Sequence, residues 1–203
     1  MPDKSHAVEK LDSLRQGLRR ARLWRFLPGI ALERVELWRR GIDWILEGTI
    51  VAQVDGPSAY VRYNVTCDDD WRTRAVSVDL FSGGSLRSLR LIPREGRWFA
   101  DGVEVPAVRG AVDVDLSWSP STNTLPIRRL DLAVGASSGP VTAAWVRFPK
   151  LSIEPLPQEY TRLAEDCYRY TSRGGAFTAE LLVDELGLVV DYGDVWRRVG
   201  EDG

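Results

Sequence analysis

YVRYNVTC, residues 60–67, is the stretch that decides the fold class of this chain. Apolar side chains alternate along it with mostly polar ones, the first set being Val61, Tyr63, Val65 and Cys67 and the second Tyr60, Arg62, Asn64 and Thr66. A period of two predicts a β-strand with one buried face, because successive side chains of a strand point to opposite sides. The same period returns at residues 112–118 and 177–183.

Short glycine-containing turns separate these alternating runs, at Gly83-Gly84, Glu95-Gly96, Asp101-Gly102, Ser138-Gly139-Pro140 and Gly174-Gly175. Many short strands joined by tight turns predict an antiparallel meander. A sheet of so many strands must curl to bury its apolar face. We therefore expect a mainly β protein in which a strongly curved, mostly antiparallel sheet forms a barrel-like or half-barrel shell.

Two segments predict helix instead. Apolar residues recur at three- and four-residue steps over residues 4–25, and arginines fill the other faces, so we expect an amphipathic helix there. Such a helix makes peripheral contact with an anionic membrane or packs on the sheet. A short helix is also expected near residues 158–166. The chain then divides into a basic helical extension, residues 1–30, and a single β-rich domain, residues 31–200.

Composition narrows the function classes. The 203 residues carry a formal net charge of −2 and a sequence pI of about 5.6, which argues against nucleic-acid binding. The polar N-terminus and the lack of a run of about 20 apolar residues predict a cytoplasmic protein. The single histidine, His6, argues against histidine-based zinc sites and catalytic triads, and Cys67 and Cys167 lack metal-binding spacing. We expect no metal and no cofactor; the oligomeric state is left open.

Three longer stretches carry a family resemblance: CDDDWRTRAVSV at 67–78, DVDLSWSPSTNTLPIRRL at 113–130 and VDELGLVVDY at 183–192. Together they resemble a bacterial family of glycolipid-binding proteins, a domain formerly of unknown function, over Leu32 to Arg197. The resemblance implies a strongly curved, β-barrel-like fold, similar in outline to bacterial lipoprotein carriers that hold acyl chains in an apolar cavity. It also implies that the ligand is a lipid or glycolipid.

The candidate site follows from charged residues that share a strand face with apolar ones, because burying such groups is costly. Arg72 and Arg74 fall on the face of Val76 and Val78, and a second predicted stripe comprises Arg128, Leu130, Leu132 and Val134. If both stripes line one cavity, the three arginines bind a phosphate or carboxylate and the apolar residues hold acyl chains. Stacking on a sugar is assigned to Trp71, Trp98 or Trp118, and hydrogen bonding of its hydroxyls to Asn123.

Asp113 and Asp115 lie two apart on one predicted strand face and leave three alternatives open. They belong to the head-group site, or they pair with Arg128, Arg129 or Arg74 and close one end of the shell. Alternatively they act as a hydrolase on a sugar or lipid ester, since a separation of about 7 Å suits an inverting glycosidase. Neighbouring arginines are expected to lower both carboxyl pKa values, which opposes the enzymatic role. A non-catalytic structural or partner-binding module, filled by its own side chains, is the remaining possibility.

Overall fold

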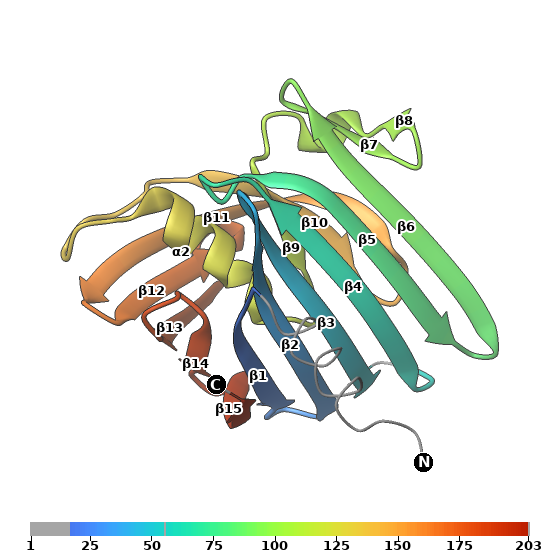
Figure 1. Ribbon diagram of the computed structural model, residues 1–203, viewed down its shortest axis with the longest axis horizontal. Coiled ribbons are helices and arrows are strands. Elements are labelled where there is room, and N and C mark those ends of the chain that lie inside the picture. Colours follow the sequence, from blue (N-terminus) through green and yellow to red (C-terminus); the bar gives the residue numbers. More distant parts are fainter. Residues whose placement is uncertain (1–16, 55, 203) are drawn as a thin grey trace, which may run out of the picture.

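The computed structural model describes residues 17–54 and 56–202, most of which belong to one large sheet (Figure 1). The strands are β1 (Leu18–Phe26), β2 (Ile30–Arg40), β3 (Asp43–Gln53), β4 (Ala59–Cys67), β5 (Thr73–Ser82), β6 (Ser85–Arg94), β7 (Arg97–Ala100), β8 (Val103–Glu104), β9 (Asp113–Leu116), β10 (Val141–Arg147), β11 (Ser152–Ala164), β12 (Cys167–Ser172), β13 (Phe177–Val183), β14 (Val189–Tyr192) and β15 (Trp196–Asp202). Short helical segments are η1 (Pro106–Val108), η2 (Ser121–Asn123), α2 (Thr124–Leu130) and η3 (Arg173–Gly175).

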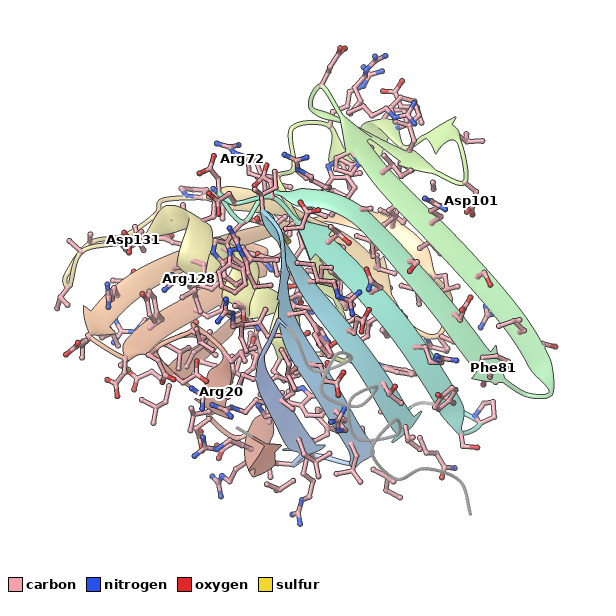
Figure 2. All side chains as sticks on the ribbon, in the orientation of Figure 1. Arg20, Arg72, Phe81, Asp101, Arg128 and Asp131 are labelled. Carbon is pink, nitrogen blue, oxygen red and sulfur yellow. The ribbon has the colours of Figure 1, made fainter. Side chains whose placement is uncertain are left out.

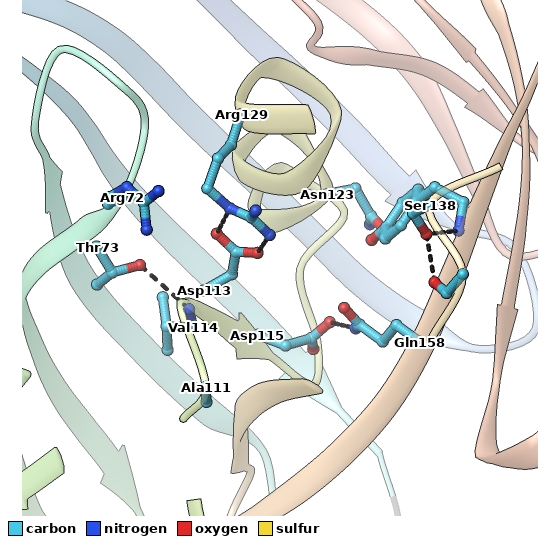
Figure 3. A network of polar contacts seen from close by, with 12 residues as sticks. Arg72, Thr73, Ala111, Asp113, Val114, Asp115, Asn123, Arg129, Ser138 and Gln158 are labelled. Carbon is cyan, nitrogen blue, oxygen red and sulfur yellow. Dashed lines mark hydrogen bonds and ion pairs between the residues drawn. The ribbon is translucent and has the colours of Figure 1, made fainter. Parts of the chain in front are cut away.

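The strand order is β8-β7-β6-β5-β4-β3-β2-β1-β15-β14-β13-β12-β11-β10-β9. Neighbouring strands are antiparallel except β9 and β10, so the predicted mainly β, mostly antiparallel sheet is confirmed. The barrel, however, is not closed, because β8 and β9 are edge strands that do not pair with each other. Instead the curl brings β9 back to the start of β5, where the backbone N–H of Val114 donates to Thr73 Oγ1 over 3.2 Å (Figure 3).

The core lies on the inner face of the curve. The four apolar residues of the 60–67 stretch are at most 5 % exposed, which confirms that their face is the buried one. Val76 and Val78 on β5 are equally buried, at 1 % each, among side chains of the same core. The acyl-chain cavity expected at these two valines is therefore occupied by the protein's own side chains.

Both expected helices are wrong where the structure describes them. Residues 18–26 form β1, which pairs with β2 on one side and β15 on the other; residues 4–16 of that prediction lie outside the described residues. A register shift between Leu18 and Arg20 offsets the alternation of β1, so its sequence mimics a helical period. Gln158 to Ala164 belongs to β11, whose backbone pairs with β10 and β12.

Helix α2 occupies a segment expected to be a strand. Pro126 falls in its first turn, where a missing N–H costs little, and Leu125 and Ile127 are buried. The segment from η2 to α2 lies inside the curve, because its side chains contact strands of both halves: Ser121 reaches Tyr63 on β4 and Asn123 reaches Tyr160 on β11. No helix within residues 17–54 and 56–202 has the length and hydrophobicity needed to cross a bilayer.

Candidate functional site

The loop between β4 and β5 carries two predicted site residues, Trp71 and Arg72. The Asp68 carboxylate accepts the backbone N–H groups of Asp70 and Arg72, which fixes the loop, and Trp71 adopts a left-handed backbone with φ of 62°. The pairing of β4 with β5 shifts between Thr66 and Cys67. The bulge places Thr73, not Arg74, on the buried face of β5.

The bulge corrects the predicted arginine stripe. Arg74 does not share a face with Val76; its side chain is 55 % exposed and lies 3.7 Å from Asp68. Arg72 and Arg128 are also exposed, and Figure 2 shows Arg72 at the upper margin of the sheet and Arg128 lower down, beside α2. The predicted second stripe does not exist as a strand face, because Arg128 and Leu130 belong to α2.

The structure does bring Trp71 and Arg128 together. The Arg128 guanidinium lies 5.7 Å from the centre of the Trp71 ring, and Trp71 stacks on Trp44 with ring centroids 4.6 Å apart. Trp71 is thus only 5 % exposed. Trp98 is completely buried and donates its indole N–H to the Ala111 carbonyl over 2.9 Å. Trp71 thus packs against two of the protein's own side chains and Trp98 lies in the core, while their assignment to sugar stacking stays a prediction.

Asp113 and Asp115 project from β9 on the same side, as predicted (Figure 3). Arg129 of α2 holds both oxygens of Asp113, from Nε at 3.0 Å and from Nη2 at 2.6 Å. Figure 3 also shows the Arg72 guanidinium directed toward this pair. The ion-pair alternative is therefore confirmed for Asp113, with Arg129 as its partner.

Burial dominates the titration of both carboxyl groups. Desolvation raises the pKa of Asp113 even though Arg129 and Arg72 oppose the shift. Desolvation also raises the pKa of Asp115 to about 6, against a hydrogen bond from Gln158 Nε2 at 2.7 Å and with support from the Asp113 charge. The expectation that arginines would lower both values is wrong, because removal from water outweighs the nearby positive charge.

Asp115 borders a pocket of about 240 Å³ that we call the aromatic pocket. Its aromatic wall comes from five strands of the C-terminal half: Trp145 from β10, Tyr170 from β12, Phe177 from β13, Tyr192 from β14 and Trp196 from β15. The Tyr170 ring lies 6.0 Å from both Phe177 and Tyr192, so these three rings form one aromatic cluster within the wall. Polar side chains complete the lining: Asp115, Ser117, Ser119, Asn123, Ser172 and Arg173.

A second hollow of about 390 Å³ adjoins the aromatic pocket at Ser172, which lines both. Pro140, Pro157, Gly174 and Gly175 form much of its surface, and we call it the proline–glycine groove. Gln158 faces this groove while its amide donates to Asp115. The two hollows therefore lie side by side and share Ser172.

A buried acid lies behind the aromatic pocket. Glu33 on β2 is fully buried, and its Oε1 accepts hydrogen bonds from the Tyr63 hydroxyl and from Ser119 Oγ, the latter at 2.6 Å. Ser121 Oγ lies 2.8 Å from the Tyr63 oxygen. Burial raises the pKa of Glu33 to about 8, the hydroxyl groups opposing the shift. Ser119 connects this acid to the pocket lining.

Comparison with known proteins identifies the family. A family model described as "Putative glycolipid-binding" matches residues 21–198. The chain belongs to this glycolipid-binding family. A crystal structure of a DUF1089 family protein from Pseudomonas aeruginosa is similar, with 36 % sequence identity and a TM-score of 0.77, over 85 % of this chain and 94 % of that one. No curated protein matches the chain.

The match to the glycolipid-binding family confirms the resemblance seen in the sequence. The region it covers includes the arginines near α2, the aromatic pocket and the Glu33 cluster. Sequence reasoning missed the aromatic wall and Glu33. Glu33 carried a usable signal, because it alternates with Ala31 and Val35 and is an acid on an otherwise apolar stripe. The wall had none of comparable strength, since each strand contributes one ring.

Tyr63 reaches Glu33 by passing over Gly48. A Cβ atom at position 48 would lie 2.0 to 2.2 Å from atoms of the Tyr63 ring. We expect Gly48→Ala to displace the ring and to lower the free energy of unfolding by about 1 to 3 kcal/mol, measured by urea denaturation. Gly29→Ala is the control, because a Cβ there meets nothing closer than 3.4 Å. Equal losses in both variants would show that the Tyr63 ring does not limit position 48.

Proposed function

We propose that this protein binds the sugar head group of a glycolipid in the aromatic pocket. The observation that carries the proposal is the combination of an aromatic wall with the Asp115 carboxylate in one 240 Å³ hollow. Ring faces offer apolar contact to the C–H face of a sugar, and a carboxylate accepts hydrogen bonds from its hydroxyls. A few polar groups in an otherwise apolar pocket are typical of small-molecule sites.

The hydrogen bonds made by Asn123 and Gln158 also support binding of a sugar in the aromatic pocket. Asn123 Oδ1 accepts from the Tyr160 hydroxyl at 2.9 Å, and its Nδ2 donates to the Pro120 carbonyl at 3.1 Å. These bonds fix the orientation of the amide at the pocket and leave its second N–H as a donor for a ligand oxygen. Gln158 orients Asp115 in the same way. The head group would thus meet polar side chains that other residues already hold in place.

The acyl part of the ligand belongs in the proline–glycine groove in this proposal. The groove adjoins the aromatic pocket at Ser172 and exposes more apolar than polar surface. Each methylene that leaves water there contributes about 0.8 kcal/mol. Arg72, Arg74 and Arg128 stay a prediction for an anionic substituent on the head group. Arg72 is the best placed of the three to contact such a substituent, because its guanidinium points toward the ion pair of Asp113 and Arg129 (Figure 3). Asp113 is in turn two residues from Asp115 on β9.

Hydrolysis receives less support from this geometry. An inverting glycosidase needs one carboxyl group as acid and another as base. Arg129 occupies both oxygens of Asp113, so β9 offers one available carboxylate at Asp115. The raised pKa of Asp115 suits a proton donor, but the partner base is not supplied by Asp113. Binding without chemistry is the function that the contacts favour.

Trp145 gives the sharpest test because it is half-buried, lies in register with Asp115 and lines the pocket. We expect Trp145→Ala to weaken binding of octyl β-glucoside at least tenfold, since a ring of this size contributes over 1.4 kcal/mol when its contact is lost. Isothermal titration calorimetry below the micelle concentration measures the affinity. Trp118→Ala is the matched control: this tryptophan is also half-buried but packs on Phe148 outside the pocket lining. Unchanged binding in Trp145→Ala would sink the proposal.

A further inference from the structure

One row of apolar side chains crosses five adjacent strands on the outer face of the sheet. The backbone register pairs each member with the next: Leu32 with Val51, Val51 with Tyr60, Tyr60 with Phe81 and Phe81 with Leu86. All five are exposed, by 38 to 55 %, and the rings of Tyr60 and Phe81 lie 5.8 Å apart. This apolar row extends for about 19 Å across the strands.

The apolar row lies at the end of the sheet where the strands reverse. The β1–β2 and β5–β6 turns are beyond it, along the lower side of Figure 1, and Figure 2 shows Phe81 at that end of β5. Ile30, at the start of β2, is 71 % exposed and extends the apolar surface toward the turn. Contiguous apolar residues on an outer face mark a surface that meets something other than water.

Charged residues occupy the outward-facing rows that follow the apolar row along the strands. The next outward-facing row, about 7 Å further along, contains Arg34, Thr49, Arg62, Asp79 and Ser88 in successive register. Arg25 of β1 lies beside Leu32 in the apolar row itself. The apolar row and the row next to it thus contain three arginines, Arg25, Arg34 and Arg62, and one acid, Asp79. The acids Glu36 and Glu47 come only in the following row, where Glu36 pairs with Arg34 at 2.6 Å.

We propose that the apolar row docks the protein on the surface of an anionic phospholipid bilayer. In that orientation the apolar side chains enter the interface, aromatic rings lie at head-group depth and the arginines meet lipid phosphates. Glu36 and Glu47 lie one row further from the membrane than these arginines. This proposal goes beyond head-group binding in the aromatic pocket, because it uses other residues on the opposite face of the sheet.

A second copy of the chain fits the same surface less well. A stable protein interface buries about 800 Å² on each partner, and a single row of five half-exposed side chains provides less. A wider contact would also have to bury the row that contains Arg34 and Arg62. Taking those charges out of water against a symmetric copy is unfavourable. A bilayer interface leaves them hydrated.

Vesicle flotation with the full chain tests the proposal. The vesicles contain phosphatidylcholine alone or with phosphatidylglycerol, and no glycolipid, so binding to them does not require the aromatic pocket. We expect binding to the phosphatidylglycerol vesicles that weakens as salt is added. Val51→Asp should weaken it at least tenfold. Val134→Asp is the matched control, since Val134 is equally exposed, at 60 % against 55 %, but lies outside the row.

Leu86→Asp, near the β5–β6 turn, repeats the test at a position where a charge disturbs the strand less than at Val51. Trp145→Ala should float like the unaltered chain, so loss of sugar binding and loss of membrane binding are separable. No binding to phosphatidylglycerol vesicles, or equal binding by Val51→Asp and Val134→Asp, would overturn the proposal. So would a dimer that Val51→Asp dissociates in analytical ultracentrifugation, because it would assign the row to a second copy.

Discussion

Arg129→Met is expected to lower the free energy of unfolding by about 3 to 5 kcal/mol at pH 7, the usual cost of removing one partner of a buried ion pair. Asp113 is 2 % exposed, and its carboxylate accepts two hydrogen bonds from the Arg129 guanidinium. Without the guanidinium, the carboxylate either stays charged in a poorly solvated place or takes up a proton. Both outcomes destabilise the folded state at neutral pH.

Urea denaturation of three variants separates the pair from other causes. The double variant Arg129→Met with Asp113→Leu removes both charges and should recover most of the loss. Arg128→Met is the neighbouring control, because Arg128 is exposed and should cost less than about 1 kcal/mol. If the double variant is as unstable as the single one, the stabilising role of the ion pair is wrong.

Glu33→Gln is expected to remove a large pH dependence of stability. The folded-state pKa of Glu33 is about 8 and its ordinary value is 4.5, so between these values the unfolded chain releases a proton that the folded chain keeps. The contribution of Glu33 is therefore complete below pH 4.5 and is lost as the pH rises toward 8. The slope approaches about 1.4 kcal/mol per pH unit between the two pKa values, so the loss between pH 5 and pH 8 is about 3 to 4 kcal/mol.

The measurement is the difference in unfolding free energy between the unaltered chain and Glu33→Gln at several pH values. Between pH 5 and pH 8 the unaltered chain should lose about 3 to 4 kcal/mol of unfolding free energy relative to Glu33→Gln. Asp115, whose pKa is also raised, contributes to both proteins and cancels. Glu36→Gln, a half-buried acid on the same strand, should follow the unaltered chain. A constant difference across this range would mean that Glu33 is not held protonated by burial.

The fold class was predictable because its signal is local. Period-two alternation in residues such as 60–67 reflects burial of one strand face, and the paired glycines at 83–84 form the β5–β6 hairpin with positive φ. Closure of the sheet was not predictable in this way. Whether β9 pairs with β8 or ends against β5 depends on the curl accumulated over all strands, which no short stretch encodes.

The candidate site was predicted only in part, because the alternation of side chains between the two faces of a strand is interrupted at bulges and where the strand gives way to a helix. A bulge at the start of β5 turned Arg74 outward, and a seven-residue helix replaced the strand expected at Arg128. Asp113 and Asp115 were placed correctly because β9 is regular over its four residues. Asn123 was also found at the pocket. The aromatic wall depends on the register between distant strands, which the sequence does not display.

Aromatic NMR spectra of the full chain titrated with octyl β-glucoside test the sugar-binding account most directly. The account predicts that the ring signals of Tyr170, Phe177 and Tyr192 shift with one common dissociation constant, while those of Trp71 and Trp98 stay fixed. Shifts confined to Trp44 and Trp71, or no response from the three pocket rings, would contradict it.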